Sequence, residues 1–291
     1  MNIREKIIEI ARENGASVAG IASVEAVRSS PSHHIYPHMD DYSGIGTVSG
    51  DDTLAGDELF NWPETAKSIV VIGMSHPQNQ PELDWWDGKG GTPGNRMLMG
   101  IAKRTRDHIE QTLGIKTQKL HYYVEKGGVF LKDAAVLAGL GCIGKSNLFI
   151  SPEFGPRIRL RALFLNSELE PTGPIDYDPC TDCDLLCRKV CPEKAMDRRA
   201  PAFSSLQTAS AEERSREHTS PLSGTSSSRP INDHTDAGEG LPARDGTYDR
   251  VLCNSRMEKD ITESEESSNS GDEPVKYCRK CEFVCPAGED R

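Results

Sequence analysis

Eight of the nine cysteines fall into two groups whose spacing suits iron–sulfur chemistry. The first group follows the pattern C-x2-C-x3-C-x3-C-P and consists of Cys180, Cys183, Cys187 and Cys191. The second starts with the isolated Cys253 and continues as C-x2-C-x3-C-P with Cys278, Cys281 and Cys285. A [4Fe–4S] cluster takes four thiolates, and in two-cluster ferredoxins the Cys-Pro cysteine of one run binds the cluster of the other. We therefore expect one cluster on Cys180, Cys183, Cys187 and Cys285, and a second on Cys191, Cys253, Cys278 and Cys281.

Two other uses of these cysteines compete with this interpretation. Paired C-x2-C motifs also bind zinc, but four ligands complete a zinc site and leave the remaining Cys-Pro cysteines unexplained. Disulfides are rare in the reducing cytosol, where we expect this chain to reside. The first run departs from the bacterial ferredoxin pattern, because three residues instead of two separate Cys183 from Cys187. The ligand role of Cys187 therefore rests on a less regular motif than those of Cys180 and Cys183.

Charge and the start of the chain indicate the compartment and the partners. The chain opens with MNIREKIIEI and has no apolar stretch long enough to cross a bilayer, so we expect a cytoplasmic protein with no membrane partner. The formal net charge is −11, and residues 1–197 alone carry 21 Lys and Arg against 27 Asp and Glu. Because nucleic-acid binding relies on cations that neutralise phosphates, this acidity disfavours tRNA as a partner.

The first 175 residues have the pattern of a mixed α/β layer domain that could position a redox centre. Apolar runs predict strands, and the β-branched run Ser68–Met74 predicts a central one. Apolar residues at helical spacing predict the helices between the strands. The expected strands are 16–24, 68–74, 118–124, 147–150 and 157–165, and the expected helices are 3–11, 97–113 and 129–138. Residues 29–57 are rich in Ser, Pro, Gly and Asp and predict a long loop.

Two polar tracts interrupt the cysteine-bearing part, which we place at residues 176–291. They cover about 198–250 and 262–273, and they lack both apolar periodicity and enough aromatic residues to form a core. Such composition predicts disordered insertions. The expected organisation is a cofactor domain at 1–175 followed by a ferredoxin-like module that holds two clusters.

The segment from Tyr123 to Gly155, with its core Ala138-Gly-Leu-Gly-Cys-Ile-Gly-Lys145, together with the two Cys-Pro runs, resembles the epoxyqueuosine reductases. That family shares a nitroreductase-like, cobalamin-binding domain and a double-cluster ferredoxin module with the reductive dehalogenases. The resemblance therefore implies an iron–sulfur, cobalamin-dependent reductase of nitroreductase-like α/β (α+β) fold. A relay of two clusters also needs a terminal redox centre, which independently favours a cofactor in residues 1–175.

The resemblance nominates residues for the cobalamin. Gly139, Gly141, Gly144 and Lys145 form a glycine-spaced turn in which the backbone could approach a bulky ligand, although a helix end followed by a tight turn would give the same pattern. Asn95 and Arg96 are secondary candidates, because the Gly-rich segment 88–96 falls where the family has a cofactor-facing segment. Cys142 stands where the family usually has an aromatic, and an isolated cysteine with apolar neighbours is usually a core residue.

Glu125 aligns with the acidic residue that protonates the substrate in the family. A carboxylic acid can do this only if its surroundings keep it protonated, and a solvated glutamate at a strand end is the alternative. The family has Asp at this position and Glu where this chain has Leu131. Both departures point to a different substrate. His33, His34 and His38 could bind a metal, although a Ser- and Pro-rich loop favours solvated histidines.

These features predict an oxidoreductase that receives electrons from a donor protein such as ferredoxin or flavodoxin and reduces a small-molecule or protein-bound substrate. The chain ends six residues after Cys285, where tRNA-acting relatives commonly continue into a helical segment, and this again disfavours tRNA. The alternative is a non-catalytic electron carrier that reduces a partner protein or its corrinoid.

Overall fold

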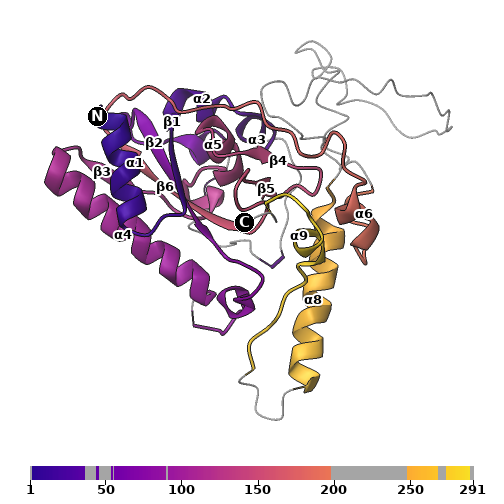
Figure 1. The fold of residues 1–291 in the computed structure, drawn as a ribbon. Coiled ribbons are helices and arrows are strands. Elements are labelled where there is room, and N and C mark those ends of the chain that lie inside the picture. The colour runs from indigo at the N-terminus through magenta and orange to yellow at the C-terminus, as the bar shows by residue number, and fades with distance from the viewer. Residues whose placement is uncertain are drawn as a thin grey trace, which may run out of the picture.

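The computed structural model describes residues 2–36, 44–45, 54, 56–89, 91–197, 248–267 and 273–288. Its centre is a four-stranded antiparallel sheet of order β1-β2-β6-β3 (Figure 1). The strands are β1 (Val18–Ser23), β2 (Ser68–Ser75), β3 (Thr117–Lys119) and β6 (Ile158–Leu165). A short hairpin of β4 (Cys142–Ile143) and β5 (Phe149–Ile150) forms a second sheet. The polar tract 198–247 lies outside the described residues.

Helices cover both faces of the main sheet, which explains why β2 is a continuous apolar run. Ile69 and Val71 point into a core shared with α2 (Val24–Arg28) and α5 (Leu131–Leu137). Val70 and Ile72 point into the opposite core, under α1 (Ile3–Glu13) and α4 (Pro93–Leu113). The expected mixed α/β layer architecture is confirmed (Figure 1).

Helix α4 begins four residues before the predicted start. Thr92 caps it by accepting a hydrogen bond from the Asn95 amide, and Pro93 occupies the first turn, where its missing N–H has no cost. The helix ends at Gly114, which adopts the left-handed conformation. Asn95 and Arg96 are therefore residues of the first helical turn.

Other elements differ from the prediction mainly in extent. Strand β3 (Thr117–Lys119) is shorter than the predicted strand 118–124. Val124, the last residue of that prediction, lies instead in the 3-10 turn η4 (Val124–Lys126). The predicted loop 29–57 contains α3 (Pro31–Ile35) and the start of η2 (Gly56–Phe60), while 37–43, 46–53 and 55 lie outside the described residues. A further 3-10 turn, η3 (Pro81–Asp84), follows β2. No described helix has the length and apolarity to cross a membrane.

The cysteine-bearing part contains three helices, α6 (Leu186–Val190), α8 (Arg250–Ser267) and α9 (Lys280–Phe283). Helices α6 and α9 pack against each other although almost a hundred residues separate them in the sequence. Helix α8 corrects the expectation of an unstructured tract at 262–273, because its last turns include residues 262–267. Arg256 pairs with Asp260 and Glu263 one and two turns later, and such pairs stabilise a polar helix.

Candidate metal centres

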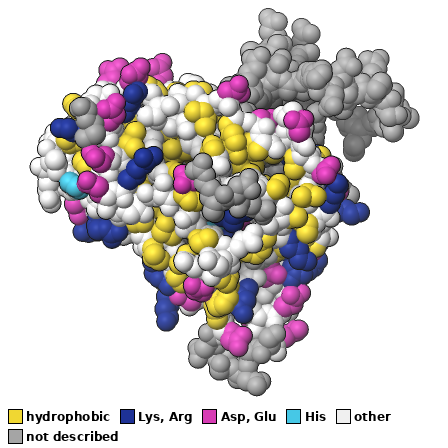
Figure 2. All heavy atoms as spheres, in the orientation of Figure 1, with side chains coloured by type: hydrophobic (Ala, Val, Ile, Leu, Met, Phe, Trp, Pro, Cys, Tyr) yellow, Lys and Arg dark blue, Asp and Glu magenta, His cyan; other side chains and the backbone are white. Residues whose placement is uncertain are grey.

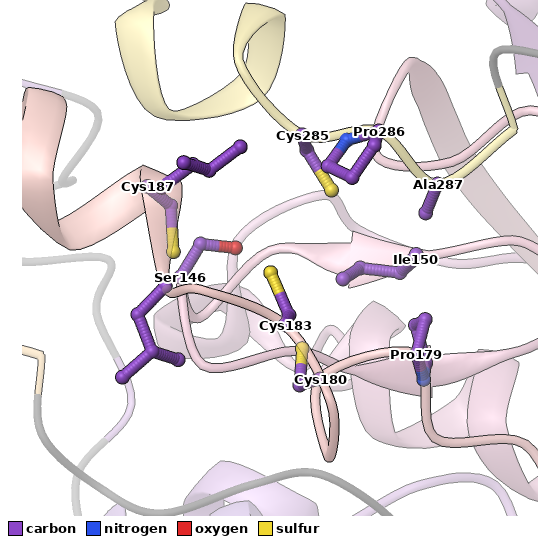
Figure 3. Close-up of a pocket in the computed structure, with 11 residues that line it drawn as sticks. Ser146, Ile150, Pro179, Cys180, Cys183, Cys187, Cys285, Pro286 and Ala287 are labelled. Atoms are coloured by element: carbon purple, nitrogen blue, oxygen red, sulfur yellow. The ribbon is translucent and has the colours of Figure 1, made fainter.

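Cys180, Cys183, Cys187 and Cys285 line one cavity of about 210 Å³. We call these four residues the first cysteine set. Figure 3 shows their sulfur atoms directed toward the same space. Most of the other lining residues are apolar and include Ile150, Leu185 and Leu186. Three cysteines of the first run thus lie together with the last cysteine of the second run, which is the arrangement that the crossed motif predicts.

Local hydrogen bonds hold the first cysteine set in position. The Cys180 amide donates to Asp178 Oδ1 at 2.8 Å, and the Lys145 amide donates to the Cys180 sulfur. Arg157 donates to the carbonyl oxygen of Cys285 at 3.3 Å. Because donors aimed at a cysteine sulfur stabilise its charged form, the Lys145 amide favours the thiolate that a cluster needs.

Burial opposes ionisation of these thiols when no cation is present. It raises the pKa of Cys180 and of Cys187 above the ordinary value, and the proximity of Cys285 and Cys183 raises both further. Iron binds thiolates, so a metal centre would supply the positive charge that lets these buried groups ionise together.

The remaining four cysteines, Cys191, Cys253, Cys278 and Cys281, form the second cysteine set. Burial raises the pKa of Cys281 to about 12, and the neighbouring Cys253, Cys278 and Cys191 contribute to that shift. Burial also raises the pKa of Cys253, with Cys191 and Cys278 adding to it. The other three thiols thus each act electrostatically on Cys281, although the four come from three separate segments.

Two residues that the sequence did not nominate support the second cysteine set. Tyr248 forms a hydrogen bond with the side chain of Cys253, and burial raises the pKa of that tyrosine. Asp260 accepts a 2.7 Å hydrogen bond from the Cys278 amide. The predicted insertion at about 198–250 therefore ends before Tyr248. The return of an aromatic residue, followed by Asp249 as a helix cap for Leu252, was the available signal.

Within the described residues, no group of three or more His, Cys, Asp or Glu lies close enough to bind a single metal ion. A zinc ion draws its ligands to about 2.3 Å from one centre. A cubane instead takes one thiolate on each of four irons, which spreads the sulfur atoms apart. The described residues therefore show no preformed zinc site.

Cys142 lies behind the first cysteine set without lining its cavity. It is fully buried in β4 and packs with Ile150 and Cys180. Burial raises its pKa to about 12, with contributions from Cys180, Asp178 and Cys285. These surroundings are those of a small core residue.

His33 is buried in a hydrogen-bond network that occupies both of its ring nitrogens. Nδ1 lies 2.7 Å from Ser30 Oγ, and Nε2 accepts from the Phe130 amide at 3.1 Å. Burial lowers the pKa of His33 to about 4, although the charge of Asp133 opposes this shift. His33 therefore has no free nitrogen for a metal, while His38 and the side chain of His34 lie outside the described residues.

The glycines nominated for a corrinoid separate into two groups. Gly139 and Gly141 pack against the protein's own backbone, where a side chain would collide with the carbonyl groups of Thr172 and Ile150 respectively. Gly144 and Lys145 instead border the first cysteine set, because a side chain on Gly144 would come within 3.3 Å of the Cys180 sulfur. Gly139 and Gly141 therefore do not form an open cradle for a large cofactor.

Asn95 and Arg96 are also engaged with the protein. Arg96 binds both carboxylate oxygens of Asp87, at 3.0 and 2.5 Å, and this hydrogen bonding lowers the pKa of Asp87 to about 2. Asn95 accepts a 2.5 Å hydrogen bond from Arg161. The polar groups of both candidates thus have partners within the fold.

Glu125 lies in the η4 turn and is half-buried. Its Oε1 accepts a 2.5 Å hydrogen bond from the Tyr36 hydroxyl, and its carbonyl accepts from the Leu54 amide at 2.7 Å. The carboxyl group is thus held by a hydroxyl donor instead of being fully solvated. Leu131 begins helix α5 and packs against the core beside the sheet.

The chain thus combines a layered α/β sheet with two sets of four cysteines. No family model matches the chain. Over 144 residues it is 31% identical to an epoxyqueuosine reductase of Lactococcus garvieae. The aligned region covers 46% of this chain and 39% of that protein. Over 71 residues it is 42% identical to the tetrachloroethene reductive dehalogenase of Sulfurospirillum multivorans, covering 24% of this chain and 14% of the relative.

A comparison with solved structures concerns the fold. A crystal structure of epoxyqueuosine reductase with an epoxyqueuosine-modified tRNA-Tyr stem loop superposes with a TM-score of 0.51 and 21% identity. That match covers 67% of this chain and 54% of the solved one, and it shows a common fold. Over part of its length the chain is thus similar to epoxyqueuosine reductases, as the sequence motifs indicated. It spans about two fifths to one half of the length of the epoxyqueuosine reductases that it matches.

Proposed function

We propose that the chain is an iron–sulfur reductase in which the two cysteine sets each hold one [4Fe–4S] cluster. The observation that carries the proposal is the cavity lined by Cys180, Cys183, Cys187 and Cys285, which joins the first cysteine run to the last cysteine of the second. That crossing is the mark of a two-cluster ferredoxin module. Its apolar lining fits a cluster, because exclusion of water influences the potential of such a centre.

The two clusters would act as a relay from a protein donor to a substrate site. Helices α6 and α9 each carry a cysteine, Cys187 of the first set and Cys281 of the second, and they pack against each other. The two cysteine sets are therefore neighbours, which suits electron transfer between them. A donor of the ferredoxin or flavodoxin type would supply single electrons.

A corrinoid is the terminal cofactor that the relationship to epoxyqueuosine reductases and reductive dehalogenases favours. Bound cobalamin would supply a reduced metal centre able to transfer electrons to a substrate. Gly139 and Gly141 do not fit this role, and Asn95 and Arg96 are bound within the fold. The part that we assign to this chain's own residues is proton delivery, for which Glu125, held by Tyr36, is the candidate.

The substrate we favour is an epoxide or a carbon–halogen compound, because the relatives are named for these two chemistries. One structural relative contains a tRNA stem loop, which supports a tRNA-borne substrate. This support opposes the expectation from the acidic charge of the chain. Because the structural relative and the acidic charge point in opposite directions, binding and reduction of a tRNA substrate must be tested directly.

Turnover by the reduced protein tests this function. Anaerobically reconstituted protein, supplied with cobalamin and a chemical reductant, should reduce either an epoxyqueuosine-modified tRNA stem loop or tetrachloroethene. The unmodified stem loop serves as the control for the first substrate. Cobalamin binding with no turnover of either compound would refute both named chemistries. Intact clusters with no cobalamin binding would instead support the alternative function of an electron carrier that reduces a partner protein.

A further inference from the structure

Five polar side chains from distant parts of the chain form a buried cluster between the sheet and the C-terminal cysteine segment, residues 273–288. His76 and Asp84 follow β2, Arg159 lies on β6, and Arg279 and Glu282 lie beside Cys278 and Cys281. We call these five residues the docking network. His76, Asp84 and Glu282 are each less than a tenth exposed.

Asp84 is the centre of the docking network. It forms ion pairs with both Arg159 and Arg279, and its Oδ2 lies 2.8 Å from His76 Nδ1. Burial alone would raise the pKa of Asp84. The hydrogen bond from His76 and the charges of Arg159 and Arg279 together hold that pKa below its ordinary value.

Arg279 connects this centre to the cysteine segment. Besides Asp84, it binds Glu282, with Nε 2.9 Å from Oε2, and its Nη2 lies 2.7 Å from His76 Nδ1. Two carboxylates and two guanidinium groups balance in charge, so the cluster can be buried without a net charge. Arg279 is adjacent to Cys278 in the chain and two residues before Cys281, so its position fixes the backbone that carries both thiols.

Backbone contacts attach the same segment to the sheet domain at other points. Trp86 and Val275 exchange two backbone hydrogen bonds of 2.9 and 2.8 Å. Arg157 donates to the Ala287 carbonyl at 2.9 Å, and Gln78 donates to the Phe283 carbonyl at 3.1 Å. None of these contacts involves a cysteine sulfur, so all of them can form without iron.

We propose that the docking network holds the C-terminal cysteine segment on the sheet before any cluster is present, with Arg279 as the positioning residue for Cys278 and Cys281. The segment then presents its thiols in preformed sites, and Asp84 sets the position of Arg279. This proposal concerns the protein without metal, and only its consequence for cluster assembly rests on the proposed function. Asp84 and Arg279 are assigned no contact with a cluster or a substrate.

Hydrogen exchange of the metal-free protein tests the proposal. In Asp84→Asn, amides of residues 276–285 should exchange at least about 10-fold faster than in the wild type, because breaking one partner of a buried charge pair is strongly destabilising. Amides of α1 should keep their wild-type exchange rates. A global loss of structure would instead raise the exchange rates of α1 as well. Asp107→Asn is a matched control, because Asp107 pairs with Arg106 and Lys103 on α4, away from the cysteines.

A second, milder variant keeps the proposal testable if Asp84→Asn does not fold. Arg279→Lys keeps the charge but loses the planar fork that binds Asp84 and Glu282 together, and it should increase exchange in the same segment by a smaller factor. The double variant with Asp84→Asn should exchange no faster than Asp84→Asn alone, because both changes break one network. Wild-type exchange rates at 276–285 in both single variants would overturn the proposal, whatever the activity of the loaded protein.

Discussion

Replacing Cys285 by Ser should damage the cluster that the first cysteine run holds, although Cys285 lies about a hundred residues further along the chain. Its sulfur shares the cavity of Cys180, Cys183 and Cys187, so its loss removes one of four ligands there. The second cysteine set, which includes the sequence neighbours Cys278 and Cys281, keeps all four thiols. Iron content should fall by up to about half, since each cluster contains four irons.

Electron paramagnetic resonance of the reduced protein identifies the damaged cluster. The signal lost in Cys285→Ser should be the same one that is lost in Cys180→Ser. Cys142→Ala is the matched control, because Cys142 is buried beside Cys180 but does not line the cavity. Loss of the signal that Cys278→Ser removes would show instead that each run builds its own site, and the crossed arrangement would be wrong.

Replacing Glu125 by Gln should lower turnover of a reducible substrate by on the order of 10²-fold or more, the usual contribution of a positioned general acid. Gln keeps the shape of the side chain and can still accept the hydrogen bond from Tyr36, but it has no acidic proton to transfer. Iron content and cobalamin binding should remain unchanged, because Glu125 does not line the cysteine cavity.

Two further variants separate a proton donor from a structural role. Glu64→Gln makes the same change at an exposed glutamate and should have no effect on turnover. Tyr36→Phe removes the hydroxyl that holds Glu125 and should reduce turnover less than Glu125→Gln does. Full activity of Glu125→Gln would exclude Glu125 as the acid.

The parts of the fold that followed from the sequence are those with a strong local pattern. Strand β2 was predictable because both of its faces are buried. The Cys-Pro motif also indicated that Cys285 lies near the first run, and Cys285 does share a cavity with Cys180, Cys183 and Cys187. Hairpin β4–β5 was only partly predicted, because a two-residue strand such as Cys142–Ile143 is too short to show a period. The start of α4 was missed because Thr92 and Pro93 precede the first apolar residue of the helix.

The features that the sequence did not predict depend on contacts between residues far apart in the chain. Asp84, Arg159 and Arg279 each resemble a solvated surface charge in the sequence, and only the fold brings them together. The polar end of α8 carries little apolar signal, and the ion pairs of Arg256 that stabilise it depend on side-chain geometry. Gly139 and Gly141 matched a cofactor turn, but the same glycine spacing also serves close backbone packing.

Iron and acid-labile sulfide per chain test the central claim most directly. Protein reconstituted under anaerobic conditions should contain about eight irons and about eight sulfides, because two cysteine sets each provide the four thiolates of one cubane. Cys142→Ala should leave these values unchanged, since Cys142 belongs to the core behind the cavity. About four irons per chain, or stoichiometric zinc in place of iron, would contradict the assignment of two clusters.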